Sequence, residues 1–284
     1  MTTGLQQTPR DPLITVEELL ELCRQPGPSP LLIGVTPLGR FCLRHIPGSR
    51  QVWRPQLSCA DSPLLISAQG FQRWARSLGI GAHTRVVIWD ERYDATRLWW
   101  AFHHYGKTDV QVLDGGLRAW RSAGLPVERG LPGTETLVAG DFTAQPAAGL
   151  PVAAASLVLQ AEHDPSLQLW DTRDPEEWSG QRRLRGARRA GRIPWAQPLN
   201  WRLFRHEPAQ NSRFRSREEI EAVIERHGLD PTRRQLFYCQ SGVRTTAAIF
   251  ALHRLGWSSQ QLLNYDGSWR EWSRDPRLPI HRDP

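Results

Sequence analysis

The sequence predicts an α/β protein of two similar domains, each a mainly parallel sheet with helices on both faces. Three observations lead to this prediction. Short apolar runs alternate with helical patterns along the chain, which is typical of parallel sheets. Sequence markers of the first half return in the second half at a nearly constant spacing. The chain has 284 residues, of which 39% are hydrophobic, enough for two domains of ordinary size.

Two markers carry the repeat. Residues 45–48 (HIPG) have a weaker counterpart at 192–195 (RIPW), about 150 positions later. Residues 114–120 (DGGLRAW) are repeated at 266–272 (DGSWREW) with almost the same spacing. Because both markers keep their order and offset, we interpret the chain as one duplicated domain.

The boundary between the copies follows from composition. Residues 129–151 are rich in glycine, proline, alanine and threonine, which favours a linker. We therefore expect an N-terminal domain over residues 1–130, a linker over 131–150 and a C-terminal domain over 151–284.

Elements of the second half can be predicted in chain order. Residues 216–219 (SREE) have the form of a capping box, so a helix should begin there and run through His227, with Gly228 ending it. Apolar runs predict strands over 167–170 and 235–238, a helix over 246–252 that ends near Gly256, and a matching strand of the first half over 85–89.

Charge and hydropathy exclude several classes. The formal net charge is +7, but Lys107 is the one lysine among 36 basic residues, so the arginine excess indicates a composition bias instead of a nucleic-acid surface. No apolar run has the length of a membrane span, and the first residues do not resemble a secretory signal. We expect a cytoplasmic monomer that binds neither nucleic acid nor membranes.

Four cysteines, Cys23, Cys42, Cys59 and Cys239, are too few for a disulfide scaffold and form no CxxC pair, so we expect no metal site. Cys23 lies on an amphipathic stretch, residues 16–24, and should be buried.

Cys239 has a different setting. It follows an apolar strand and precedes a helix, the place where open α/β sheets bind ligands. Backbone N–H groups and the positive end of the next helix favour an anion there, so this thiol should ionise readily. Gly242 permits a tight turn, and Arg244 adds a positive charge. The polar residues that follow Cys239 make its burial improbable. In the first half, Asp90 takes the corresponding position.

These features together resemble the rhodanese family in its tandem-domain sulfurtransferase form. The resemblance is carried by the motifs at residues 45–48, 112–120, 171–178 (DTRDPEEW) and 267–272 and by the Cys239 loop. It implies two rhodanese-like domains, of which the N-terminal one has lost its cysteine. It also implies that Cys239 takes sulfane sulfur from a donor, carries it as a persulfide and passes it to cyanide or a thiol, without a metal or organic cofactor.

Loop length bears on the reaction. Related phosphatases place arginine after a cysteine and five residues, which is the position of Thr245 here. Arg244 comes one position earlier, so the loop should accommodate a single outer sulfur atom, and phosphatase activity is the weaker alternative. The loop residues expected to bind the donor are Gln240, Ser241, Gly242, Val243, Arg244 and Thr245.

The donor is either thiosulfate or 3-mercaptopyruvate. Ser241 matches the mercaptopyruvate pattern of the family, while Gln240 and Arg244 do not. That pattern also pairs the loop serine with a histidine and an aspartate of the N-terminal domain. His45 matches the histidine, but the aspartate is missing from this sequence. Gly34 stands where relatives often have the aspartate at the end of a strand. A guanidinium near the thiolate favours a dianion, so thiosulfate is our first choice.

An arginine run over residues 182–192 contains six arginines and no acid. We expect four of the six to be solvated. By spacing, Arg185 is the closest match to the donor-binding arginine of the family, and Glu177 stands where a second family arginine would be. Trp195 and Trp201 are candidates to line the cleft. A module that only carries or senses sulfur is the non-enzymatic alternative.

Overall fold

The computed structural model describes residues 10–59, 62, 64–131, 138–146, 148–206 and 212–283, so part of the expected linker lies outside it. In the first lobe the elements are β1 (Leu13–Ile14), α1 (Val16–Arg24), β2 (Leu31–Val35), α2 (Leu38–Leu43), β3 (Arg50–Val52), the 3-10 helix η1 (Arg54–Leu57), α3 (Ala68–Ser77), β4 (Val86–Asp90), α4 (Ala95–His104), β5 (Val110–Leu113) and α5 (Gly116–Ser122).

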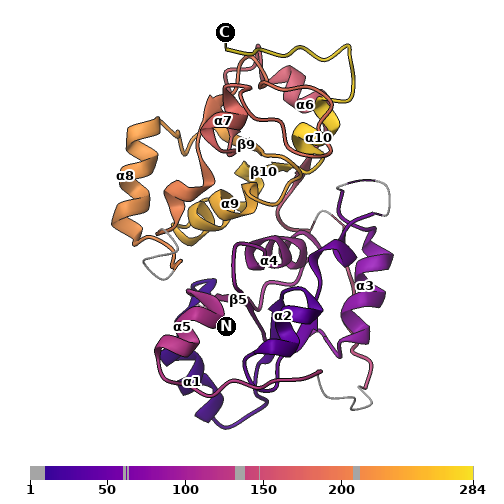
Figure 1. Cartoon of the computed structure of the whole chain (residues 1–284), viewed down its shortest axis with the longest axis vertical. Helices are drawn as coiled ribbons and strands as arrows, with labels where there is room; N and C mark the ends of the chain where they lie inside the picture. The colour runs from indigo at the N-terminus through magenta and orange to yellow at the C-terminus, as the bar shows by residue number, and fades with distance from the viewer. Residues whose placement is uncertain are drawn as a thin grey trace, which may run out of the picture.

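The second lobe contains β6 (Val152–Ala153), α6 (Ala155–Gln160), β7 (Leu167–Asp171), α7 (Pro175–Trp178), β8 (Gln197–Pro198), the 3-10 helix η2 (Trp201–Phe204), α8 (Arg217–His227), β9 (Arg234–Tyr238), α9 (Thr245–Arg254), the 3-10 helix η4 (Ser259–Gln261), β10 (Leu262–Tyr265) and α10 (Ser268–Trp272). The lobes lie one above the other in Figure 1, with α4 and α9 at their junction.

Both lobes share one sheet topology. The first sheet has the order β1-β5-β4-β2-β3 and the second β6-β10-β9-β7-β8, and the strands pair in parallel. All five residues of the central strand β4 are buried, as expected for a parallel sheet covered on both faces. The predicted α/β class and the duplication are thus confirmed.

The predicted start and end of the helix after Ser216 are confirmed as well. Helix α8 begins with the predicted capping box, in which the Ser216 hydroxyl accepts from the backbone N–H of Glu219 and the Glu219 carboxylate accepts from that of Ser216. Gly228 ends the helix in a left-handed conformation, with φ of 72°.

The two sheets differ where the repeat has diverged. In the second sheet, the carboxylate of Asp171 accepts a hydrogen bond of 2.6 Å from the hydroxyl of its strand neighbour Tyr238. At the matching pair of the first sheet, Gly34 lies beside Trp89, and a Cβ at Gly34 would come within 2.4 Å of the Trp89 ring. The indole therefore explains why the first copy has glycine in place of the aspartate.

Helices α4 and α9 join the two lobes. The hydroxyls of Thr96 and Thr246 lie 2.9 Å apart, and Trp99 packs edge-on against Phe250 with ring centroids 4.8 Å apart. These rings belong to one apolar cluster that continues from the first lobe into the second. The lobes therefore share a hydrophobic core, which should make them unfold together.

His103 of α4 should make stability depend on pH. Burial lowers its pKa to about 3, with a smaller contribution from His253. The folded state then binds fewer protons than the unfolded state, whose histidine titrates near 6.5, so this contribution to stability is lost as pH falls from about 6.5 towards 3. In His103→Phe we expect the slope of unfolding free energy against pH, measured by urea unfolding, to decrease by about 1.4 kcal/mol per pH unit; burial also lowers the pKa of His104 and His253, so part of the slope should stay. An unchanged slope in that variant would contradict this assignment.

One cysteine prediction is wrong. Cys23 is exposed, because the buried residues of α1 are Val16 and Leu19, near the start of the helix. Among the described helices, none has the length and apolar character needed to cross a bilayer.

Candidate active site

Cys239 lies directly after β9 and is 1% exposed. The expectation that it would not be buried is therefore wrong. The polar residues next to it misled the prediction, because Gln240 and Ser241 turn partly towards solvent whereas the cysteine lies beneath the loop.

Helix α10 anchors this loop. The Ser268 hydroxyl accepts hydrogen bonds from the backbone N–H groups of Cys239, at 3.1 Å, and Gly242, at 3.0 Å, and donates to the carbonyl of Tyr265. The N–H of Trp269 donates to the carbonyl of Cys239 at 3.0 Å. The second repeat marker thus holds both ends of the turn around the thiol.

Gly242 is required by geometry. Its φ is 68°, and a Cβ at this position would lie 2.4 Å from a carboxylate oxygen of Asp266. Its carbonyl accepts from the guanidinium of Arg97, which also pairs with Asp266 at 2.5 Å. Because Arg97 belongs to α4, the first lobe helps to fix the loop of the second.

The inner face of the loop offers hydrogen-bond donors. Within the described part of the chain, five backbone N–H groups between Cys239 and the first turn of α9 have no acceptor, and the buried hydroxyl of Thr245 has no partner. Such N–H groups at the start of a helix stabilise an anion. These donors belong to Gln240, Ser241, Val243, Arg244 and Thr245.

Arg244 turns away from this ring of donors. Its guanidinium forms a bidentate ion pair with Glu177, at 2.6 and 2.9 Å, and lies 3.6 Å from Asp174. Burial lowers the pKa of Arg244, but the hydrogen bonds with Glu177 and the negative charges of Cys239, Glu177 and Asp174 together raise it above its ordinary value. Glu177 is 1% exposed, so the pair is enclosed in the protein. The sequence had identified both residues but not their contact.

A cavity of about 280 Å³ opens beside Ser241. It is lined by two arginines that the sequence analysis did not identify as site residues, Arg54 from η1 and Arg270 from α10. Cys59 also lines it. Partial burial and the neighbouring guanidinium groups of Arg274 and Arg54 lower the pKa of Arg270. Arg54 pairs with Asp94 at 2.7 Å, whereas Arg270 has no carboxylate partner among the described residues. The one sequence signal for Arg270 was its place in a repeated marker.

The arginine run contacts the loop through its backbone. The side-chain amide of Gln240 donates to the carbonyl of Arg185 at 3.2 Å, while the Arg185 side chain is exposed and does not line the cavity beside Ser241. Four of the six arginines are exposed, as expected: Arg182, Arg183, Arg185 and Arg188.

His45 is not brought to Ser241. It is 3% exposed in the first lobe, where one ring nitrogen lies 3.0 Å from the carbonyl of Phe41 and the other 3.4 Å from the Glu128 carboxylate. The serine–histidine pair of the mercaptopyruvate pattern is therefore absent from the described structure.

The two candidate tryptophans have different positions. Trp195 packs edge-on against Trp272, and its indole N–H donates to the carbonyl of Val158, so it belongs to the core. Trp201 lines a different cavity between the lobes, opposite Asp90. Over the described ranges, no cluster of three histidine, cysteine or acidic residues has a metal-binding arrangement.

Comparison with known proteins agrees with this architecture. The model of the rhodanese-like domain matches residues 15–123 and 154–275. The probable 3-mercaptopyruvate sulfurtransferase of Pseudomonas aeruginosa is 36% identical over 214 residues, covering 71% of this chain and 69% of that protein. The putative thiosulfate sulfurtransferase SseA of Mycobacterium tuberculosis is 32% identical over 253 residues, covering 83% and 79%.

Among solved structures, the anaerobic ergothioneine biosynthesis enzyme from Chlorobium limicola, in complex with trimethyl histidine, superposes with a TM-score of 0.84. The match covers 96% of this chain and 71% of that one at 21% identity, so it shows a shared fold.

Proposed function

Since the chain belongs to the rhodanese family, we propose that it is a sulfurtransferase that moves sulfane sulfur from thiosulfate to a thiophilic acceptor through a persulfide on Cys239. The observation that carries the proposal is the buried cysteine at the centre of a loop whose backbone donors lack acceptors within the described structure. Such a loop stabilises a negatively charged sulfur atom.

The reaction has two displacement steps. In the first, the Cys239 thiolate attacks the outer sulfur of thiosulfate, the S–S bond of the donor breaks, and sulfite leaves with the electron pair of that bond. In the second, cyanide or a thiolate attacks the outer persulfide sulfur, and Cys239 leaves as a thiolate again. The free N–H groups of the loop stabilise the terminal persulfide anion between the steps.

Thiosulfate suits this site because its transfer needs no proton relay. Mercaptopyruvate carries a thiol proton that must be removed, and His45 makes its contacts elsewhere. We assign the anionic end of the donor to Arg270, because Arg54, which lines the same cavity, is paired with Asp94. This differs from our expectation for Arg244, whose charge is matched by Glu177. Mercaptopyruvate sulfurtransferase remains the alternative function, because the Pseudomonas relative carries that name.

Phosphatase activity and a role in sulfur sensing have less support. A phosphatase needs the loop arginine to face the phosphate, whereas Arg244 faces Glu177. A module that merely senses sulfur would load Cys239 without turning over.

Steady-state rates with the two donors, using cyanide as acceptor, test the proposal. We expect the larger kcat/KM with thiosulfate and one added sulfur on the Cys239 peptide by mass spectrometry after donor treatment. A much larger value with mercaptopyruvate would overturn the donor assignment, and an unmodified Cys239 would overturn the mechanism.

Arg270→Ala should weaken donor use. Loss of one charge-assisted contact of about 1.5–3 kcal/mol predicts a roughly ten- to hundredfold lower kcat/KM for thiosulfate, mostly through KM. Arg274→Ala is the matched control, since Arg274 is an exposed arginine near Arg270 that does not line the cavity. Equal kinetics in both variants would remove Arg270 from the donor site.

A further inference from the structure

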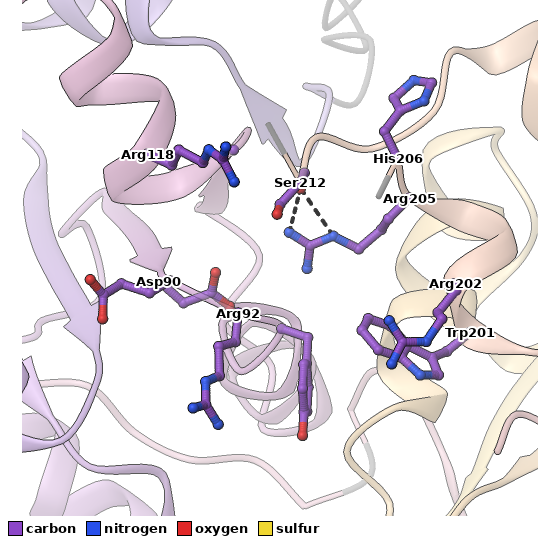
Figure 2. A pocket seen from close by; sticks show the side chains of 11 residues that line it. Asp90, Arg92, Arg118, Trp201, Arg202, Arg205, His206 and Ser212 are labelled. Carbon is purple, nitrogen blue, oxygen red and sulfur yellow. Dashed lines mark hydrogen bonds between the residues drawn. The ribbon is translucent and has the colours of Figure 1, made fainter. Parts of the chain in front are cut away.

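The first lobe carries an aspartate at the place of the reactive cysteine. Asp90 follows the register of Cys239 at the end of β4 and lines a cavity between the lobes (Figure 2). Its carboxylate accepts a hydrogen bond of 2.7 Å from the backbone N–H of Ala95, the first residue of α4. In the second lobe, the N–H of Thr245, the first residue of α9, has no acceptor within the described chain. The first lobe therefore fills the start of its own helix with a carboxylate, and any part it has in the chemistry must act on the other lobe.

Arg97 is the residue through which α4 reaches the loop around Cys239. It is 2% exposed, and its Nη1 donates to the carbonyl of Gly242 at 3.1 Å and lies 2.5 Å from the carboxylate of Asp266. Helices α4 and α9 each have ten residues, and the third position, which is Arg97 in α4, is Ala247 in α9. An alanine side chain has no donor, so the second lobe does not return this contact. The contact runs from the lobe without the reactive cysteine to the loop that holds it.

The carbonyl that Arg97 binds belongs to the same peptide group as one of the loop donors. Gly242 contributes the C=O of that group and Val243 the N–H, which has no acceptor among the described residues. Because this peptide bond is trans and planar, its C=O and its N–H point in opposite directions. The guanidinium, together with the side-chain amide of Asn264 at 3.2 Å, fixes the direction of the C=O. The same contacts therefore fix the direction of the Val243 N–H, which points away from Arg97.

The next donor of the loop is fixed by a similar arrangement. The carbonyl of Val243 accepts from the hydroxyl of Thr246 at 2.7 Å, and that hydroxyl lies 2.9 Å from the hydroxyl of Thr96 in α4. A hydroxyl has one proton, so Thr96 is the donor of the second contact. The Val243 carbonyl shares its peptide group with the N–H of Arg244. Two consecutive donors of the loop are thus oriented by contacts that lead back to α4.

We propose that Arg97 is a positioning residue for sulfur transfer, which orients the N–H of Val243 towards the negatively charged sulfur on Cys239. A hydrogen bond to the charged form favours that form, so this donor stabilises both the thiolate and the terminal persulfide anion. Arg97 does not line the cavity beside Ser241, so it should affect turnover and leave donor affinity unchanged. The inference rests on the proposed function, and it makes the first lobe part of the catalytic apparatus of the second.

A double variant tests this role without leaving a buried charge. Arg97→Met combined with Asp266→Asn removes both members of the ion pair, while the asparagine oxygen can still accept from the backbone N–H of Leu65, as Asp266 does at 2.7 Å. We expect the pH profile of Cys239 alkylation by iodoacetamide, followed on the Cys239 peptide by mass spectrometry, to move up by roughly one pH unit. With thiosulfate and cyanide, kcat should fall roughly tenfold while KM stays within about twofold, in contrast to Arg270→Ala.

Arg254→Met combined with Asp11→Asn is the matched control. Arg254, the last residue of α9, pairs with Asp11 of the first lobe at 3.0 Å, so this variant also removes an ion pair between the lobes, at the end of α9 away from the loop. Its alkylation profile and kcat should match the wild type, whatever its melting temperature. An unchanged alkylation profile in the Arg97 variant, or an equal shift in the control, would overturn the proposal. Alkylation needs no sulfur donor, so a wild type that transfers no sulfur would refute the proposed function, while the profile would still decide the role of Arg97.

Discussion

Cys239→Ser is expected to abolish sulfur transfer, with turnover reduced at least about a thousandfold. A serine hydroxyl is a poor nucleophile towards sulfur at neutral pH and cannot hold sulfane sulfur as a persulfide. Formation of thiocyanate from thiosulfate and cyanide measures the loss. The substitution keeps the size of this buried side chain, so an unchanged melting temperature should accompany the loss of activity.

Cys59→Ser is the closest control, because Cys59 lines the cavity beside Ser241. Its turnover should stay within about twofold of the wild type, as should that of Cys23→Ser and Cys42→Ser. Near-normal turnover in Cys239→Ser would refute the catalytic assignment. A large loss in Cys59→Ser would instead show that a second thiol takes part in the transfer.

Much of the fold followed from local signals. The capping box joins Ser216 to Glu219, three positions later, and the helix ends at a glycine, Gly228. Both signals are local, so they can be recognised in the sequence without knowledge of the fold. The duplicated markers at residues 114–120 and 266–272 required no structural knowledge either, and they predicted two sheets of one topology.

The site was predicted less completely, because its contacts join distant residues. Arg54 and Arg270 meet beside Ser241 although they come from different lobes. The contact between Glu177 and Arg244 spans 67 positions. From the sequence, we interpreted Glu177 as the loss of an arginine that the family has at this position. We interpreted Arg244 as an additional residue that binds the donor. Only the fold shows that the two changes compensate each other.

The Glu177–Arg244 pair should dominate the stability of the catalytic loop. Arg244→Ala removes the bidentate partner of the buried Glu177 carboxylate and leaves it the half-exposed Arg182 at 3.5 Å, and breaking such a buried pair costs about 3–5 kcal/mol of unfolding free energy. Glu177→Ala should be destabilising for the reciprocal reason. Removing both should cost clearly less than the sum of the two single effects, with a coupling of about 1–3 kcal/mol in urea unfolding. Additive losses would show that the pair does not stabilise the fold.

The Glu177→Ala/Arg244→Ala variant also separates stability from donor binding. It contains no uncompensated charge, so it should fold, and its KM values report whether Arg244 ever contacts the donor. If the guanidinium serves the ion pair alone, KM for thiosulfate should stay within about threefold of the wild type, in contrast to Arg270→Ala. A rise of tenfold or more that spares mercaptopyruvate would return Arg244 to the donor site. In that case the ion pair with Glu177 must open when thiosulfate binds, since one guanidinium cannot keep two hydrogen bonds to Glu177 and turn towards the ring of N–H groups around Cys239.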